Sequence, residues 1–209
     1  MDPNCGVAIL LDGEFVKKHL QGKLRRFPSA KDMTGLCYSL MQHQEFVGSR
    51  LHRIYYYTAD PLTAGKLVNP LDKSTKNFKN TQVAQANAAL LDALELEPNV
   101  AVRRGVLALH GWKLGKTALA SLRSGKKSQI TGPDLVPNIQ QKGVDMRIGL
   151  DIAALALKKL VYGIVLVSGD SDMLPAMKFA RREGLRVYLH TLGYASVRRD
   201  LKAHADILI

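Results

Sequence analysis

The feature of this sequence that most constrains its fold is a pair of short, wholly apolar runs, each followed at once by aspartate. Residues 7–11 read VAILL and lead into Asp12, and residues 163–167 read GIVLV and lead into SGDSD at residues 168–172. Continuous apolar runs of this length are typical of strands buried on both faces of a parallel sheet. Because parallel strands need long crossover connections, we expect helices between the strands.

The rest of the chain continues this alternation. Further strands are predicted at residues 52–58, 100–109, 185–190 and 207–209. Helices are predicted at residues 30–47, 82–96, 145–160, 173–182 and 195–203. The polar residues 61–80 are interpreted as a loop, and the basic, glycine-rich residues 111–133 as the least regular part of the chain. Strands that alternate with helices predict an α/β fold with a mostly parallel central sheet.

Basic residues are concentrated in one part of the chain. The 209 residues include 30 Lys and Arg against 18 Asp and Glu, for a formal net charge of +12. Residues 101–143 carry 8 basic and 1 acidic side chains, whereas residues 1–100 carry 12 and 10. This segregation favours a polyanionic partner, nucleic acid or anionic lipid. The candidates for phosphate contact are Arg103, Arg104, Lys113, Lys116, Arg123, Lys126 and Lys127, with Trp112 as a candidate for base stacking.

Several classes of protein are disfavoured by what the sequence lacks. No run approaches the ~20 apolar residues of a membrane helix, so we expect no membrane partner. The N-terminus shows no basic region of a signal peptide, and two cysteines, Cys5 and Cys37, are too few for a disulfide scaffold. Neither a dinucleotide fingerprint nor a P-loop is present. These observations favour a protein of the reducing cytoplasm.

Aspartates stand where a parallel sheet brings strand ends and helix starts together. Asp12 follows the first apolar run, and Asp170 and Asp172 follow the second. Asp145 begins the helix that leads into the second run, and Asp151 lies about one and a half turns further along it. Ligands of open α/β sheets bind outside the carboxyl ends of the strands. We therefore expect up to five carboxylates to converge at one edge.

Each aspartate also has a simpler structural interpretation. Asp12 is compatible with a turn, Asp145 with a helix cap, and Asp151 with an ion pair to Arg147 one turn back. Together they favour a metal site, because two carboxylates ~5 Å apart repel by roughly 3 kcal/mol at an effective dielectric of ~20. Hard oxygen ligands suit Mg²⁺ or Mn²⁺, which can promote hydrolysis of a phosphodiester.

Four stretches of the sequence resemble the NYN family of PIN-like nucleases. They are LLDGEFVKK, QQKGVDMRIGLDIAALAL, VLVSGDSDMLPAMKFARREGLRVYL and LKAHADILI. The combination of KGVDMRIGLD with SGDSD is specific, and residues 61–135 carry less of the resemblance. It implies a three-layer, Rossmann-like, PIN-like fold, with one domain over residues 1–209 and a basic excursion at about 110–135. It also implies a metal-dependent ribonuclease.

The resemblance implies roles for the aspartates. Asp12, Asp145, Asp170 and Asp172 correspond to metal-coordinating carboxylates, which are catalytic in this family. Asp151 falls where related domains carry a further helix carboxylate, so we include it among the catalytic candidates.

Other positions near these aspartates are expected to support the site. Ser168 matches a small hydroxyl residue that orients a carboxylate or a phosphate, and Lys142 is a candidate for contact with the scissile phosphate. Phe15 departs from the pattern, because many members carry Asn there. Either Glu14 or a water substitutes for that Asn, or the site is changed.

The sequence thus predicts a Mg²⁺- or Mn²⁺-dependent endoribonuclease that acts on single-stranded or structured RNA. A non-catalytic RNA-binding or regulatory module on the same scaffold is one alternative, motivated by Phe15. A structure-specific DNA nuclease is another. We also consider a homodimer.

Overall fold

The core of the molecule is a seven-stranded sheet. A computed structural model describes residues 6–62, 65–79 and 81–209, so Cys5 lies outside the described residues. The strands of the sheet are β1 (Gly6–Asp12), β2 (Arg50–Ala59), β5 (Val100–Leu114), β6 (Leu135–Lys142), β7 (Val161–Val167), β8 (Arg186–His190) and β9 (Ile207–Leu208). Their order is β6-β5-β2-β1-β7-β8-β9, and every neighbouring pair is parallel except β5 and β6. The prediction of a mostly parallel α/β sheet is confirmed.

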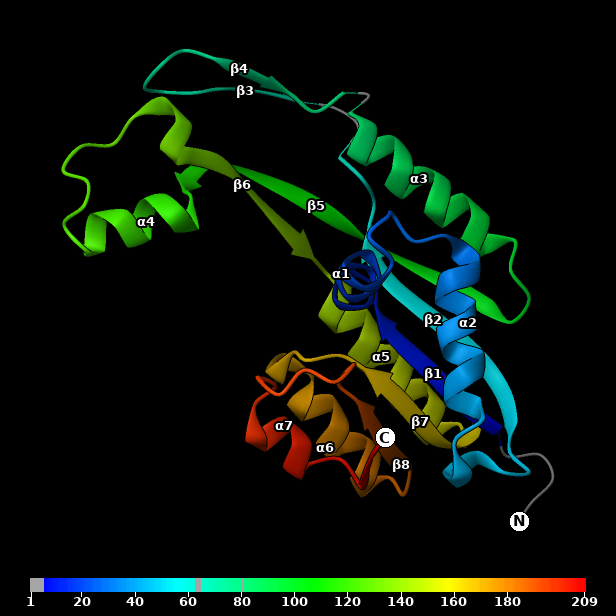
Figure 1. Ribbon diagram of the computed structural model, residues 1–209. Helices are drawn as coiled ribbons and strands as arrows, with labels where there is room; N and C mark the ends of the chain where they lie inside the picture. Colours follow the sequence, from blue (N-terminus) through cyan, green and yellow to red (C-terminus); the bar gives the residue numbers. More distant parts are fainter. Residues whose placement is uncertain (1–5, 63–64, 80) are drawn as a thin grey trace.

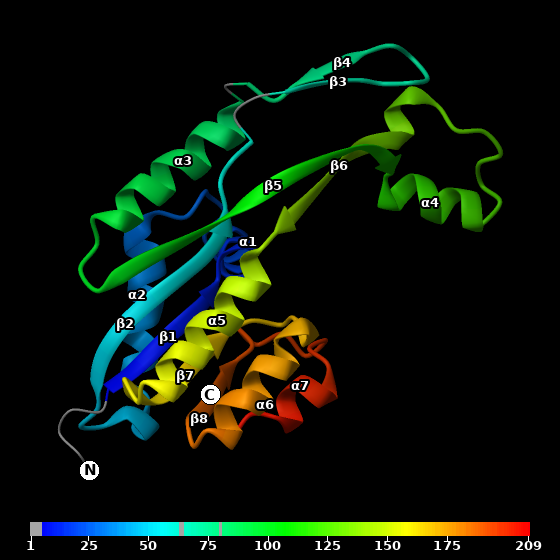
Figure 2. The same cartoon turned by 180° about the vertical axis from the view of Figure 1, so that it is seen from behind.

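Helices cover both faces of this sheet (Figures 1 and 2). The main helices are α1 (Gly13–Leu24), α2 (Ala30–Met41), α3 (Gln82–Glu95), α4 (Lys116–Arg123), α5 (Val144–Leu157), α6 (Leu174–Arg182) and α7 (Arg199–Ala203). Val7, Ile9 and Leu11 of β1 pack in one core with α1, α2 and α3. Ala8 and Leu10, on the other face, pack in a second core with α5, α6 and α7. The three-layer arrangement follows from this alternation of side chains along buried strands.

The second half of β5 leaves the sheet as an antiparallel ribbon with β6. Up to Gly105, β5 pairs with β2, and from Val106 onward it pairs with β6. The ribbon projects from the body and carries α4 near its end (Figures 1 and 2). We call residues 106–142 the arm. A Cβ at Gly105 would lie 2.7 Å from the carbonyl oxygen of Lys142, so glycine permits the close approach of β6 where the arm begins.

A small antiparallel hairpin lies beside the arm. Its strands are β3 (Lys66–Val68) and β4 (Thr75–Asn77). The indole Nε1 of Trp112 donates a hydrogen bond to the carbonyl oxygen of Val68 at 2.9 Å. The side-chain amide of Asn69 donates to the carbonyl oxygen of Gly132 at 2.9 Å. These two bonds tie the hairpin to the arm.

The structure corrects several predicted boundaries. Residues 111–133 are more regular than expected, because they contain the end of β5, helix α4 and the short 3-10 helix Gly132–Asp134. The predicted loop at 61–80 contains the β3–β4 hairpin within its described part. The helix predicted at 30–47 ends at Met41, before the 3-10 helix Gln44–Phe46, and the helix predicted at 195–203 begins at Arg199.

Across the described part of the chain, no helix combines the length and the apolar character that a membrane crossing requires.

Candidate active site

The carboxyl ends of β1 and β7 lie side by side where the strand order reverses. From β1 the chain continues to β2 on one side, while β7 begins the other half of the sheet. Open α/β sheets bind ligands at such a switch point. Asp12 is the last residue of β1, and residues 168–170 directly follow β7. The structure therefore brings these two predicted segments together.

A chain of hydrogen bonds joins the two segments. Asp12 caps α1, and its Oδ1 accepts the backbone N–H of Phe15 at 3.2 Å. Its Oδ2 accepts the hydroxyl of Ser168 at 3.1 Å. The same hydroxyl oxygen accepts the N–H of Asp170 at 3.1 Å, and Asp170 Oδ1 accepts the N–H of Asp172 at 2.9 Å. Because Ser168 is fully buried, it is well placed to hold Asp12 and Asp170 in register.

Asp145 approaches the same edge from the opposite face. It lies in the first turn of α5, where the helix dipole favours an acidic side chain. Burial raises its pKa above the ordinary value of 3.8, and the charges of Asp170 and Asp172 raise it further. Burial also raises the pKa of Asp12, and the charges of Asp170 and Asp145 raise it further. The hydrogen bonds from Phe15 and Ser168 lower this pKa, but the net shift is upward. The four carboxylates thus share one electrostatic neighbourhood.

These four carboxylates differ from most acids of the protein in having no cationic partner. Within residues 6–62, 65–79 and 81–209, eleven other acidic side chains lie within 4.0 Å of a Lys or Arg nitrogen. In a chain with an excess of basic residues, this concentration of unpaired negative charge is the chemistry of a cation site. The four aspartates are Asp12, Asp145, Asp170 and Asp172, and among the other described acids only Glu45 and Asp72 likewise have no Lys or Arg nitrogen within that distance.

The donor set fits a hard divalent cation, although the side chains do not yet converge. Carboxylate oxygens are the preferred ligands of Mg²⁺ and Mn²⁺. Among the described residues, however, no three His, Cys, Asp or Glu side chains form a ready-made metal group. Each Asp12 oxygen accepts one hydrogen bond, from the N–H of Phe15 or the hydroxyl of Ser168, and keeps a second lone pair for a cation.

Asp151 does not join this cluster. Its Oδ2 accepts Arg103 Nε at 2.7 Å and the hydroxyl of Tyr57 at 2.9 Å. Helical spacing suggests Arg147 as the partner of Asp151. In the structure, Arg147 Nε instead donates a hydrogen bond to the carbonyl oxygen of Arg104 at 2.8 Å. Of the five carboxylates expected at this edge, Asp151 is therefore engaged elsewhere, in an ion pair with Arg103 of β5.

The predicted phosphate contacts fall into two groups. Arg103 is held by Asp151 and lies 5.2 Å from the centre of the Tyr55 ring. Arg104 pairs with Asp60, Asp92 and Glu95, and Lys127 pairs with Asp134. These three cations already have acidic partners. Trp112 is half-buried and bonded to the hairpin. The remaining candidates are exposed on the arm: Lys113, Lys116, Arg123 and Lys126.

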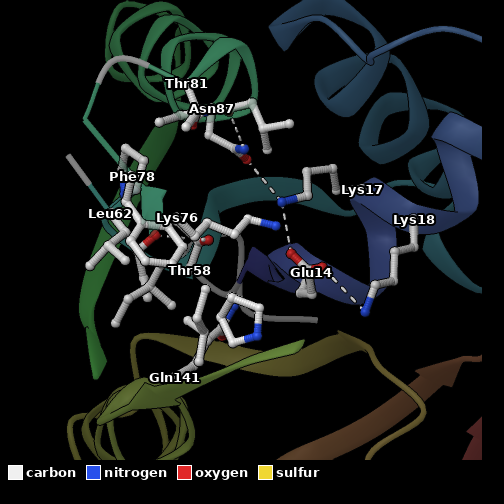
Figure 3. Close-up of a pocket in the computed structure, with 17 residues that line it drawn as sticks. Glu14, Lys17, Lys18, Thr58, Leu62, Lys76, Phe78, Thr81, Asn87 and Gln141 are labelled. Atoms are coloured by element: carbon white, nitrogen blue, oxygen red, sulfur yellow. Dashed lines mark hydrogen bonds and ion pairs between the residues drawn. The ribbon is translucent and has the colours of Figure 1, made fainter. Parts of the chain in front are cut away.

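Glu14, considered as a substitute for the expected Asn, has cationic partners of its own. Its carboxylate pairs with Lys17 at 2.7 Å and Lys18 at 3.2 Å, and it lines a separate pocket (Figure 3). Burial raises its pKa, but the two lysines outweigh that effect and leave the pKa below its ordinary value. Lys142 is exposed at the end of β6, three residues before Asp145.

Phe15 and Tyr194 form an aromatic wall beside the carboxylates. Their ring centres are 5.4 Å apart, and both line a groove of about 500 Å³ together with Asp12 and Asp170. A Cβ at Gly169 would lie 2.9 Å from the Phe15 ring, so glycine admits this ring next to the β7 turn. Sequence reasoning missed Tyr194, because the irregular segment before α7 carries no pattern that assigns it to the site.

The fold and the unpaired carboxylates define a PIN-like α/β protein. Residues 77–209, more than half of the chain, match the family model of the NYN domain. The chain therefore belongs to the NYN family, which is of the nuclease type. The matched region includes Asp145, Asp170 and Asp172, whereas Asp12 lies before it.

Individual relatives do not extend this assignment. The uncharacterized protein y4oD of Sinorhizobium fredii is 42% identical over 50 residues, which cover 24% of this chain and 23% of that protein. The crystal structure of a protein of unknown function from Vibrio parahaemolyticus covers all of this chain and 94% of its own, with a TM-score of 0.52 and 16% identity. At that identity the similarity concerns the fold alone.

Proposed function

We propose that this protein is a Mg²⁺- or Mn²⁺-dependent endoribonuclease. The observation that carries the proposal is the gathering of four aspartates without cationic partners at the switch point of a parallel sheet. They are Asp12, Asp145, Asp170 and Asp172. A nuclease-type family, a carboxylate edge and a basic arm are three independent features that favour the same chemistry.

The residues of the chain have separable roles in this proposal. The four aspartates hold the cation, which supplies Lewis-acid activation of the phosphodiester when bound. The hydroxyl of Ser168 orients Asp12 and fixes the turn that carries Asp170. The raised pKa of Asp12 and of Asp145 reflects a site that is unfavourable for several negative charges without a counter-ion.

RNA is the proposed substrate because of the charge and shape of the arm. The exposed cations lie near the end of β5, on α4 and just after α4, and this part of the arm projects from the body, where an extended phosphate backbone can reach it (Figure 1). Contacts of this kind bind without reading sequence and weaken as salt is added. The members of this group are Lys113, Lys116, Arg123 and Lys126.

Cleavage of a fluorescent single-stranded RNA tests the proposal. We expect cleavage with Mg²⁺ or Mn²⁺ and none with EDTA. Asp170→Asn should lower the rate by at least about 100-fold, because it removes one negative ligand. Asp92→Asn is the matched control, since Asp92 is exposed on α3 and outside the cluster. Intact RNA with every metal, for both the wild type and Asp170→Asn, would contradict the proposal, and a matched DNA substrate identifies a DNA nuclease.

A non-catalytic RNA-binding module is the second candidate. It is favoured by Phe15 at the position of the family Asn and by the absence of a three-carboxylate group among the described side chains. This candidate predicts salt-sensitive RNA binding with no metal-dependent cleavage. An Asp12→Ala variant that loses cleavage but keeps binding would exclude it.

A further inference from the structure

A second pocket lies next to the carboxylate edge, between α1, α3, the end of β2, the β4 segment and the arm (Figure 3). Its volume is about 670 Å³, within the ~300–1,000 Å³ that small-molecule sites occupy. The walls come from five separate parts of the fold. Residues that line it include Lys17, Thr58, Lys76, Phe78, Asn87 and Gln141.

The pocket is connected to the carboxylate site through α1. Asp12 caps this helix, and Glu14, in its first turn, lines the pocket. Lys18 lines both the pocket and the groove that holds Asp12 and Asp170. A ligand that spans the two spaces therefore passes Lys18.

The lining of the pocket combines an apolar floor with polar groups at its rim. Leu62, Phe78 and Ile139 contribute apolar surface. Lys17 is fixed between Glu14 and Asn87, at 2.7 Å and 2.8 Å, so its ammonium group is held in the wall of the pocket. With three lysines against one glutamate, the rim is positively charged. The lysines are Lys17, Lys18 and Lys76.

Two polar side chains of the lining remain available to a ligand. Across the described residues, neither Lys76 nor Gln141 makes a side-chain hydrogen bond or an ion pair, and both extend toward the pocket in Figure 3. An ammonium group and an amide beside an apolar surface match a flat ring with polar edges and a neighbouring phosphate. This combination distinguishes a nucleotide from a purely apolar ligand.

We propose that this pocket, the base pocket, binds one nucleoside of a single-stranded nucleic acid whose adjacent phosphate passes Lys18 toward the carboxylates. Stacking of a base on an aromatic side chain, here Phe78, contributes about 1–3 kcal/mol to single-strand binding. The inference rests on the proposed function in one respect, because the strand in the base pocket is the strand that the carboxylates act on. The base pocket makes one base of the bound strand more important for affinity than the others, and phosphate contacts with the arm alone do not have this effect.

Abasic scanning tests the base pocket directly. Short RNA strands that each lack one base, with every phosphate retained, are titrated against the protein in EDTA. We expect one position at which loss of the base weakens binding about 5- to 50-fold. Val83→Trp, which places a large side chain at the rim, should abolish this positional effect. Leu96→Trp, at the C-cap of the same helix, is the control, because Leu96 is 87% exposed and does not line the pocket.

Charge reversal gives a second, independent test. Lys76→Glu should weaken binding of the intact strand about 5- to 10-fold through loss of a phosphate contact. Lys66→Glu, on the paired strand of the same hairpin and outside the pocket, should change binding less than about twofold.

The outcomes separate the two proposals. Equal effects at every abasic position, or a positional effect that persists in Val83→Trp, would overturn the base pocket even if the protein cleaves RNA. Conversely, a positional effect that Val83→Trp removes supports the base pocket even if no metal supports cleavage, and only the nuclease proposal then fails.

Discussion

Ser168 donates a hydrogen bond to Asp12 across the gap between two parallel strands, with 3.1 Å between Oγ and Oδ2. The same oxygen accepts the N–H of Asp170. One buried hydroxyl therefore fixes both the last residue of β1 and the turn after β7. Because these are the two sides of the switch point, this side chain positions Asp12 and Asp170 relative to each other.

The first prediction concerns this hydroxyl. Ser168→Ala leaves Asp12 Oδ2 and the Asp170 N–H without their partner. We expect RNA cleavage and Mn²⁺ affinity to fall about 10- to 100-fold, as for other residues that orient metal ligands. The free energy of unfolding should fall by about 1–3 kcal/mol. Cleavage assays, Mn²⁺ titration and urea unfolding measure these effects.

The control for Ser168→Ala is Thr34→Val. Thr34 is also buried, and its hydroxyl donates to the carbonyl oxygen of Ala30 within α2, far along the chain from the site. This variant should lose stability but keep its Mn²⁺ affinity and its rate. If Ser168→Ala retains full Mn²⁺ affinity, the hydroxyl is a structural group and the positioning role is wrong.

The second prediction is the pH dependence of Asp145→Asn. A carboxyl with a raised pKa binds more protons in the folded than in the unfolded protein, so it favours folding at low pH, and this contribution is lost as pH rises through the raised pKa. Burial, Asp170 and Asp172 raise the pKa of Asp145 from its ordinary 3.8. In EDTA, the stability of the variant relative to wild type should therefore increase between about pH 4 and about pH 7. Urea unfolding across this range measures the difference.

Asp200→Asn should show the opposite trend. Arg198 lowers the pKa of Asp200, so its contribution to stability is present above the ordinary 3.8 and is lost as pH falls. The variant should become less stable relative to wild type as pH rises. If the free energy of unfolding of wild type and of Asp145→Asn changes with pH in parallel, the neighbours of Asp145 do not destabilise its charged form.

The strands and the carboxylate edge could be predicted, because both depend on local patterns. The apolar runs at 7–11 and 163–167 lie inside β1 and β7, and the rule for strand ends brings Asp12 and Asp170 together. The sequence does not predict α1, because its polar sequence GEFVKKHLQGKL buries only Gly13, Val16 and Leu20. Its start depends on the side chain of Asp12, which acts as its cap.

The arm and the position of Asp151 could not be predicted, because they depend on distant contacts. β6 contains Pro137 and polar residues, and it becomes a strand only by pairing with the extended β5. Asp151 is separated by 48 residues from Arg103, its ion-pair partner. Spacing along a helix suggests Arg147 instead, which in the structure bonds to a backbone carbonyl.

The third prediction separates a structural from a catalytic role for Asp151. Asp151→Asn removes the charge that faces Arg103, and the two side chains are only 22% and 36% exposed. The free energy of unfolding should fall by about 1–3 kcal/mol. The cleavage rate per folded molecule should change less than about threefold, since Asp151 lies outside the cluster. Urea unfolding and cleavage below the unfolding temperature measure both. A 100-fold slower rate at full stability would instead make Asp151 catalytic.

The last prediction concerns the salt dependence of RNA binding. Removing the four exposed cations of the arm, in K113A/K116A/R123A/K126A, should weaken binding and make the slope of log K against log salt shallower. Each phosphate contact with a single strand contributes about −0.7 to that slope, so four contacts change it by about 2–3 units. Fluorescence anisotropy in EDTA over a range of KCl concentrations measures the slope.

The matched control removes four exposed cations outside the arm, just after α5 and on α6, in K158A/K159A/K178A/R182A. Both variants lose the same formal charge, so a uniform electrostatic attraction predicts equal changes. Direct contact predicts a shallower slope for the arm variant alone, because counterions are released only where phosphates meet cationic side chains. Equal slopes in the two variants would place the nucleic acid elsewhere and leave the arm without a role in binding it.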